Sequence, residues 1–496
     1  MRPARLELAA LLALQLGLGS PYLHTVPRFY MDEAWEASLG HSLAYEAALR
    51  HGIIEGWGGM HVHFVQNQVV LPFLCAAAYK LFGFGIVESR MTSLLVSLLA
   101  VAGIHGVMRR WFDRRAALWI TLATIVNPWF FEISRRVRPE IYYLALSFAA
   151  LAAWLGATES RSRAKAAAAG VLAGLSALSH PTGVVLMAAL VVTAWRRPFP
   201  KRLAAWTLAA FVAMILPYVA YVLWATRDPN VSFLAQMRAG HGVLRSDPSA
   251  VVRGEFHRWG HFFQWPYGAP LAATFATAWL IACWRGGRDR AIALGIAFFA
   301  ACMPLTTVNT TSRYLIAIMP LFIALSVRML LEPRDASGAA RSRFPARFRH
   351  AAAGIYVLAC AGAIGLMFQR LHDADVRRLF DRVAAVTGPR ATVFGSMMFW
   401  MGGERYRYGP YPLDEHWNVP ADAVRRHRFD YAVRSAWSFD TSAGIAAPPA
   451  RMPDFRPENA IDEVCHQYGR RIAEFRDPHY GPIEIYKLDW GGQMQP

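Results

Sequence analysis

The stretch Pro27-Arg-Phe-Tyr-Met-Asp-Glu-Ala-Trp35 follows closely on the first long apolar run of the chain, Leu6–Leu23. The basic segment Met1–Arg5 precedes that run, which is the pattern of a signal peptide or a signal anchor. No small-x-small cleavage site follows the run cleanly, so an uncleaved anchor is favoured. We therefore expect Asp32 and Glu33 just outside the first membrane span, where paired carboxylates suggest chemistry at the bilayer surface.

The composition is that of a polytopic membrane protein. Of the 496 residues, 55% are hydrophobic and 17% are charged, whereas soluble domains carry about 25% charged residues. The net charge of +18 comes from basic residues clustered in short loops between apolar runs. Such loops report membrane topology, so no nucleic-acid partner is expected.

Eleven helical spans are predicted from the apolar runs, near residues 6–23, 90–108, 116–131, 140–157, 166–179, 182–195, 203–225, 270–284, 291–307, 314–331 and 351–368. With the N-terminus inside, the short basic loops after residues 108, 160, 195, 284 and 327 all fall on the inner side, as the positive-inside rule requires.

Two choices decide this topology. The run Val69–Phe84 is apolar enough to span, but counting it would place the basic loop at 109–115 outside, so we interpret it as a juxtamembrane helix. The run 166–195 is divided at Ser179-His-Pro-Thr-Gly183, because proline and glycine interrupt a helix there.

The chain then divides into a transmembrane part, residues 1–369, and a soluble part, residues 370–496. The outer face carries the loops 24–89, 132–139 and 226–269 as well as the soluble part. The stretches Thr392-Val-Phe-Gly395 and Phe429-Asp-Tyr-Ala-Val-Arg434, with a charged helical stretch at 372–386, predict a small α/β domain.

The outer loop Glu132-Ile-Ser-Arg-Arg-Val-Arg-Pro-Glu140 breaks the charge rule, because Arg135, Arg136 and Arg138 lie outside. Arginine binds phosphate through its planar fork, so these side chains are candidate phosphate ligands. Two other interpretations stay open: they contact lipid head groups, or they pair with the neighbouring glutamates.

The remaining candidates also have ordinary explanations. Asp32 and Glu33 could simply be solvated, or could cap a helix over Ala34–Leu49. Arg313 begins a span and could snorkel to the interface or hold a phosphate. His61 and His63 are spaced for a metal, but no third ligand is evident, and surface histidines are the simpler interpretation.

The order of several motifs resembles a known family. Asp32-Glu33 follows the first span, and Arg313-Tyr314 begins a late one. The intervening motifs are Lys80-Leu-Phe-Gly83, Glu88-Ser-Arg90, Arg135-Arg-Val-Arg-Pro-Glu140 and Gly174-Leu-Ser-Ala-Leu-Ser-His-Pro181. Over residues 1–335 the chain resembles GT-C glycosyltransferases of the protein O-mannosyltransferase and aminoarabinose-transferase type. The resemblance implies a polytopic α-helical fold with a C-terminal soluble domain.

The resemblance also implies a function. Such enzymes take a sugar from a polyprenyl-phosphate donor on the outer face of the membrane, which here implies a bacterial inner membrane. The acceptor hydroxyl belongs to a glycan, a lipid or a protein. The sequence requires no cofactor, and a divalent metal ion is compatible with it. The site residues carried over are Asp32, Glu33 and Glu140 as the acids, and Arg135, Arg138, Arg313, Tyr314, His61, His63, Gln66 and Asn67 as substrate contacts.

In the implied mechanism Asp32 is the general base that takes the acceptor proton, Glu33 and Glu140 orient the acceptor, and Arg138 and Arg313 hold the phosphate. One alternative is a transporter or flippase of lipid-linked sugars, which would need polar residues at mid-membrane; the apolar runs here are nearly free of charge. A polysaccharide polymerase or ligase is a second alternative, and a membrane-anchored binding module is a third.

Overall fold

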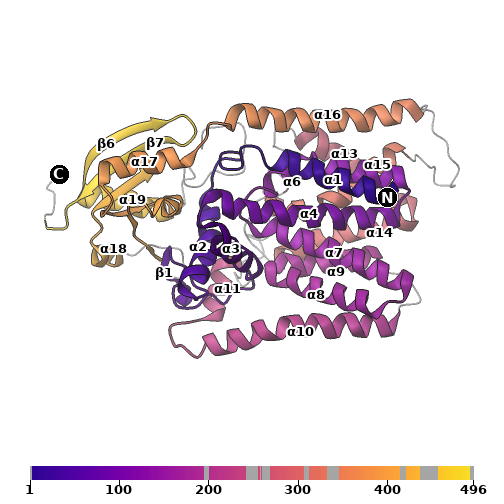
Figure 1. Ribbon diagram of the computed structural model, residues 1–496, viewed down its shortest axis with the longest axis horizontal. Helices are drawn as coiled ribbons and strands as arrows, with labels where there is room; N and C mark the ends of the chain where they lie inside the picture. Colours follow the sequence, from indigo (N-terminus) through magenta and orange to yellow (C-terminus); the bar gives the residue numbers. More distant parts are fainter. Residues whose placement is uncertain are drawn as a thin grey trace.

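The computed structural model describes residues 3–194, 200–241, 255–256, 259, 268–305, 312–331, 346–413, 421–435 and 456–491. A body of roughly aligned helices makes up most of the molecule, and strands with three shorter helices form a lobe at one end (Figure 1). The candidate site lies where the first outer loop meets this lobe.

The helical body contains long helices from the whole length of the chain. They are α1 (Pro3–Gly19), α4 (Ile86–Trp111), α5 (Arg114–Ile125), α7 (Pro139–Ser160), α8 (Arg163–Ser179), α9 (Pro181–Ala194), α10 (Lys201–Ala225), α13 (Gly268–Arg285), α14 (Gly287–Cys302), α15 (Met319–Leu331) and α16 (Ala346–Leu371). A 3₁₀ helix, η3 (Ser312–Ile318), leads into α15, and η2 (Met303–Leu305) follows α14.

Each of the eleven predicted spans coincides with a helix of this body. By length and composition, five helical segments in the described residues can cross a membrane: Ile86–Trp111, Pro139–Ser160, Lys201–Ala225, Tyr314–Leu331 and His350–Thr387. The last of these runs beyond α16 into the next helix. The membrane-spanning character of the chain is therefore clear, and the number eleven stays a prediction.

The helix break predicted at residues 179–183 is confirmed. α8 ends at Ser179, His180 adopts an extended conformation (φ −175°, ψ 148°), and α9 begins at Pro181. A proline at the first helical position needs no backbone N–H partner, so Pro181 starts a helix that it could not have continued.

Close packing in the body is set by small residues. At Gly103 of α4, a Cβ atom would lie 2.7 Å from the backbone nitrogen of Ala149 in α7. Only glycine allows α4 and α7 to approach this closely, and α7 carries the functional loop at its start.

The first outer loop folds into short elements. They are α2 (Met31–Glu46), β1 (Ile54–Gly56), η1 (Trp57–Gly59) and α3 (Val70–Phe82). α3 has 13 residues, so it is about 20 Å long, too short for a bilayer core of about 30 Å. Its length fits the juxtamembrane helix predicted from the sequence. Two further short helices, α6 (Pro128–Ile133) and α11 (Phe233–His241), border the same region.

The C-terminal lobe contains a mixed five-stranded sheet with strand order β3-β2-β5-β7-β6. β2 pairs in parallel with β3 and β5, and β7 pairs antiparallel with β5 and β6. The elements are α17 (Val376–Thr387), β2 (Thr392–Gly395), η4 (Met397–Gly402), β3 (Arg407–Tyr408), β4 (Tyr411–Leu413), α18 (Ala421–His427), β5 (Tyr431–Ser435), α19 (Arg456–Tyr468), β6 (Gly469–Asp477) and β7 (Gly481–Leu488).

Helices cover both faces of this sheet. Val393 and Val433 pack in the same core as α17, whereas their neighbours Phe394 and Ala432 pack with α19. Successive strand residues point to opposite faces of a sheet. The apolar residues of β2 and β5 therefore pack alternately against the helix on one face and the helix on the other. The lobe is an α/β unit, and its position on the outer side of the membrane stays a prediction.

The lobe is joined to the first outer loop through backbone pairing. Strands β1 and β4 form a parallel two-stranded sheet in which Ile54 pairs with Tyr411 and Gly56 with Leu413. The residues predicted as a separate soluble domain therefore share a sheet with the loop that carries Asp32.

Candidate active site

The carboxylate of Glu33 is buried in an ion pair with Arg90 of α4. Arg90 donates from Nη2 to Oε1 at 2.7 Å and from Nε to Oε2 at 2.8 Å, and neither side chain is exposed. Backbone N–H groups of Tyr30 (3.1 Å) and Val137 (3.2 Å) donate to the same carboxylate. Glu33 therefore ties together the start of α2, the helix α4 and the loop before α7.

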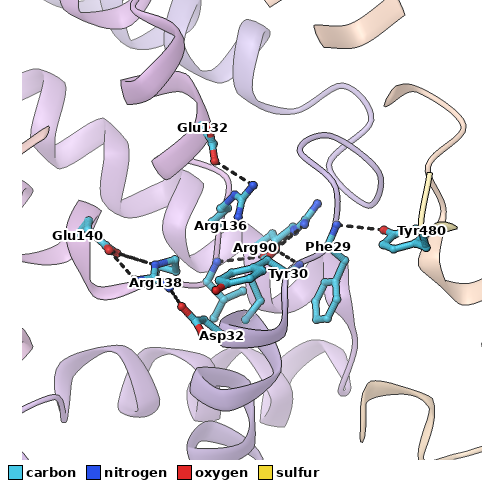
Figure 2. Close-up of polar contacts among 11 residues, drawn as sticks. Phe29, Tyr30, Asp32, Arg90, Glu132, Arg136, Arg138, Glu140 and Tyr480 are labelled. Atoms are coloured by element: carbon cyan, nitrogen blue, oxygen red, sulfur yellow. Dashed lines mark hydrogen bonds and ion pairs between the residues drawn. The ribbon is translucent and has the colours of Figure 1, made fainter. Parts of the chain in front are cut away.

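Beside this pair, Arg138 lies between two carboxylates (Figure 2). Its Nη2 donates to Oε1 of Glu140 at 2.8 Å and its Nε donates to both oxygens at 3.1 Å, while its Nη1 donates to Asp32. Burial acts to lower the pKa of Arg138, but the charge of Glu140 and its hydrogen bonds, with smaller contributions from Tyr314 and Tyr30, together outweigh burial and raise the pKa. Arg138 is thus a fixed cation that orients Asp32.

Exposure separates the members of this cluster. The side chain of Glu140 is fully buried and that of Arg138 is 8% exposed, whereas that of Asp32 is 31% exposed. Asp32 is therefore the carboxylate of this group that an incoming substrate can reach.

Glu36 is a further carboxyl group of the site, and sequence reasoning missed it. It follows Asp32 by one helical turn, so both side chains project from the same face of α2. Glu36 is buried, and its Oε2 atom has no hydrogen-bond partner among the described residues. Burial, and secondarily the charge of Glu140, raise the pKa of Glu36 well above its usual range. A neutral carboxyl group there can donate a hydrogen bond, and the Asp32–Glu36 spacing was the available signal.

Arg135, predicted as a substrate contact, makes its polar contacts with the end of α1. Its guanidinium donates to the carbonyl oxygens of Leu18 (3.4 Å) and Pro21, and it stacks over the rings of Phe131 and Phe368 at 4.8 and 5.3 Å. The residue is fully buried. Its direction and partners indicate a structural role, because the sequence could not show which way each arginine points.

Arg136, a candidate phosphate ligand of the outer loop that was not among the site residues carried over from the resemblance, has spare donors. Its Nη2 pairs with Oε1 of Glu132 at 2.9 Å (Figure 2), and its guanidinium carbon lies 5.7 Å from the centre of the Tyr30 ring. Its Nε and Nη1 atoms are buried without a hydrogen-bond partner among the described residues. Unpaired buried donors cost free energy unless a ligand satisfies them.

Of the predicted pair Arg313-Tyr314, the structure describes only the side chain of Tyr314. The side chain of Arg313 lies outside the described residues. Tyr314 is buried, and its ring stacks on His180 with centroids 5.3 Å apart. The start of η3 is therefore packed against the break between α8 and α9.

Four candidates from the first loop serve to fix that loop. Gln66 donates to the carbonyl of Gln236 (2.6 Å), and Asn67 donates to that of Ala177 (3.0 Å). The backbone N–H of Gly56 donates to Nδ1 of His61 (3.1 Å), and the ring of His63 packs on Trp224 with centroids 4.8 Å apart. Within the part of the chain that the structure describes, these side chains make no polar contact with Asp32.

The C-terminal lobe reaches to within a few residues of Asp32. The hydroxyl of Tyr480 accepts a hydrogen bond from the backbone N–H of Phe29 at 3.1 Å (Figure 2). Arg28 donates to the carbonyl of His479 at 2.9 Å. The lobe thereby fixes the segment that leads into α2.

In the described residues, no group of three or more His, Cys, Asp or Glu side chains is arranged to hold a metal ion. The carboxylates of the site are paired with arginines instead. The arrangement offers the accessible carboxylate of Asp32, the buried carboxyl group of Glu36 with its raised pKa, and the cations Arg136 and Arg138.

Comparison with known proteins gives a family match over part of the chain. A family model described as dolichyl-phosphate-mannose-protein mannosyltransferase matches residues 67–224, less than half of the chain. No curated protein matches the sequence.

Solved structures match over nearly the whole chain. ArnT from Cupriavidus metallidurans bound to undecaprenyl phosphate is 15% identical, with a TM-score of 0.55 and coverage of 98% of both chains. Its apo state gives a TM-score of 0.56 at 15% identity over 97% of both chains. The oligosaccharyltransferase AglB from Archaeoglobus fulgidus, in complex with an inhibitory peptide and a dolichol-phosphate, is 14% identical with a TM-score of 0.53, covering 99% of this chain and 75% of that one.

The chain therefore has the fold of the GT-C glycosyltransferases. The resemblance indicated by the ordered motifs, to the protein O-mannosyltransferase and aminoarabinose-transferase type, agrees with the family model over residues 67–224 and with the fold of ArnT.

Proposed function

We propose that the protein is a membrane glycosyltransferase that moves a sugar from a polyprenyl-phosphate donor to a hydroxyl acceptor. Its fold matches proteins solved with undecaprenyl phosphate and dolichol-phosphate. The observation that carries the proposal is the exposed carboxylate of Asp32, held by the buried cation Arg138 at the start of α7. The enzyme acts at the outer face of a bacterial inner membrane, where the first loop and the C-terminal lobe meet.

The reaction inverts the anomeric centre in a single displacement. Asp32 takes the proton of the acceptor hydroxyl as its oxygen bonds to the anomeric carbon. The bond between that carbon and the phosphate oxygen breaks, and its electron pair leaves with the polyprenyl phosphate. Because one carboxylate is sufficient for such a displacement, no covalent sugar–enzyme intermediate is needed.

The other charged residues take roles that follow from their contacts. Glu33 holds the loop through Arg90, in place of the acceptor-orienting role implied by the resemblance. Arg138 and Glu140 orient Asp32, and the neutral carboxyl of Glu36 donates a hydrogen bond to a bound hydroxyl. Arg136 supplies its two spare donors to the leaving phosphate.

The acceptor is a glycan, a lipid or a protein that approaches from the outer surface, and the transferred sugar is a hexose or a pentose. In this scheme the acceptor approaches Asp32 from the side formed by the C-terminal lobe and the first outer loop. A divalent metal ion is not required in this scheme, because arginines meet the phosphate charge.

The test uses the full-length protein in lipid nanodiscs with a radiolabelled polyprenyl-phosphate sugar. We expect release of polyprenyl phosphate together with a labelled acceptor when cell-envelope extract is added. The Asp32→Asn variant should lose turnover by roughly 10²- to 10⁴-fold, with its thermal unfolding unchanged.

Two results would contradict the proposal. Full activity in Asp32→Asn would remove Asp32 as the base. Movement of the intact donor across the bilayer, without release of lipid phosphate, would instead make the protein a flippase.

A further inference from the structure

A large cavity lies among α7, α8, α9 and α10, at the end of the helical body away from Asp32. Its volume is about 1170 Å³. α7 starts beside Arg138 and Glu140, whereas the cavity is lined by its second half, from Ala150 to Glu159. The cavity is therefore separate from the candidate active site and belongs to the opposite side of the membrane.

Helix α10 forms the outer wall of this cavity. It is attached to α8 by close packing, because a Cβ atom at Gly170 would lie 2.1 Å from the carbonyl oxygen of Thr207. The Thr207 hydroxyl also donates to the carbonyl of Ala166 at 2.9 Å. Only 6% of the apolar window of α10 is buried inside the protein, so its other faces are left to contact lipid.

The rim of the cavity is cationic. Among the residues that the structure describes, its charged side chains are five basic residues and one acid: Arg110, Arg161, Arg163, Lys201, Arg202 and Glu159. Glu159 pairs with Arg110 at 3.2 Å. The other four cations are exposed and make no side-chain hydrogen bond or ion pair with any described residue, so they are available to an anion.

The interior of the cavity is apolar. Leu151, Trp154, Met187, Leu190 and Phe211 line it. A soluble anion would satisfy the rim but leave these walls in contact with water, which is unfavourable. A zwitterionic lipid would fill the walls but would gain little from four unpaired cations. The ligand that meets both requirements has an acyl chain and a net negative head group.

We propose that this cavity is a binding site for an anionic phospholipid of the inner leaflet. One acyl chain fills the apolar space behind α10, and the phosphate meets the basic residues at the starts of α8 and α10. Basic pockets between membrane helices on this side are suited to such head groups. The positive-inside distribution alone explains the charges but predicts no saturable site.

The experiment measures retention of defined lipids by the delipidated full-length protein with native mass spectrometry. The probes are palmitoyl-oleoyl phosphatidylglycerol and palmitoyl-oleoyl phosphatidylcholine, added separately at equal concentrations. We expect saturable binding of phosphatidylglycerol and weak, unsaturable binding of phosphatidylcholine. Lys201→Gln/Arg202→Gln should weaken phosphatidylglycerol binding on the order of tenfold.

Two matched controls locate the site. Arg109→Gln/Arg115→Gln removes two cations from the same side of the membrane but outside the cavity. Val191 lines the cavity and is 46% exposed, so Val191→Trp should block lipid binding, whereas Val184, 50% exposed on the same helix, does not line it. Val184→Trp should bind lipid normally.

The proposal is overturned if the two lipids bind alike, if both double variants lose binding equally, or if Val191→Trp retains full binding. None of these outcomes depends on sugar transfer, so the proposed function stands or falls independently.

Discussion

The carboxylate of Glu33 and the guanidinium of Arg90 form a two-point ion pair from which solvent is entirely excluded. The neighbouring residue Asp32, on the same turn of α2, keeps 31% of its side chain exposed. Two adjacent acids that look alike in the sequence therefore have different surroundings: Glu33 is enclosed in an ion pair, and Asp32 is open to solvent.

Replacing Glu33 should lower the free energy of unfolding, and not only the rate of catalysis. In Glu33→Ala the guanidinium of Arg90 would stay buried without its partner, which typically lowers the free energy of unfolding by about 3–5 kcal/mol. Thermal unfolding of the detergent-solubilised variant measures this. The double variant Glu33→Leu/Arg90→Leu should recover much of the loss, and a single variant that melts like the wild type would show that the pair is not structural.

Arg138 should matter for both stability and turnover. Arg138→Met would take its arginine partner away from the fully buried Glu140 and would free Asp32 from its orienting cation. We expect a loss of about 3–5 kcal/mol in unfolding free energy together with loss of turnover. Arg138→Met/Glu140→Met should restore the melting temperature but not the activity. Restoration of both would mean that Arg138 has no part in catalysis.

Arg136 is expected to act on the donor phosphate. Removal of its two spare donors in Arg136→Gln should cost charged hydrogen bonds of about 1.5–3 kcal/mol each, seen as a fall of at least tenfold in kcat/KM for the lipid-linked donor. Steady-state kinetics with varied donor concentration provides the measurement. Arg136 also pairs with Glu132, so Glu132→Gln serves as the control and should leave kcat/KM near that of the wild type.

His51 should make the outer loop sensitive to acid. Burial lowers the pKa of His51 to about 3. Its ring lies against Trp35 and Phe64, with centroids 4.2 and 5.1 Å away, and its Nδ1 is 3.0 Å from the Ser38 hydroxyl. The unfolded chain binds a proton near pH 6.5 and the folded protein does not, so stability is full above pH 6.5 and is lost as the pH falls toward 3.

The slope should approach 1.4 kcal/mol per pH unit for this one group, roughly between pH 6 and pH 3. Unfolding measured at several pH values in wild type and in His51→Phe isolates the contribution. The variant should show a shallower decline with acid, and identical slopes in the two proteins would exclude His51 as the cause.

Local signals predicted local structure well. The dipeptide His180-Pro181 marked the division between α8 and α9. The motif Thr392–Gly395 became strand β2 in the C-terminal sheet. In each case neighbouring residues carry the physical cause, so no distant contact had to be known.

Partners distant in sequence were the part that could not be predicted. Glu33 and Arg90 are 57 residues apart, and Arg135 reaches a carbonyl 114 residues away. Nothing in the outer-loop motif shows that Arg135 points toward α1 while Arg136 keeps unpaired donors. The three-residue strands β1 and β4 are also too short to be recognised before their pairing is seen.

The contact between Phe29 and Tyr480 joins residues 451 positions apart, which constrains how the protein is made. The loop that carries Asp32 is synthesised early. Its strand β1 can pair only after β4 has been made, and Phe29 can bond to Tyr480 only after the turn before β7 has been made. Any product of interrupted synthesis would therefore carry the loop without its support. Under the proposed function, we therefore expect sugar transfer only from chains that have been synthesised through Tyr480.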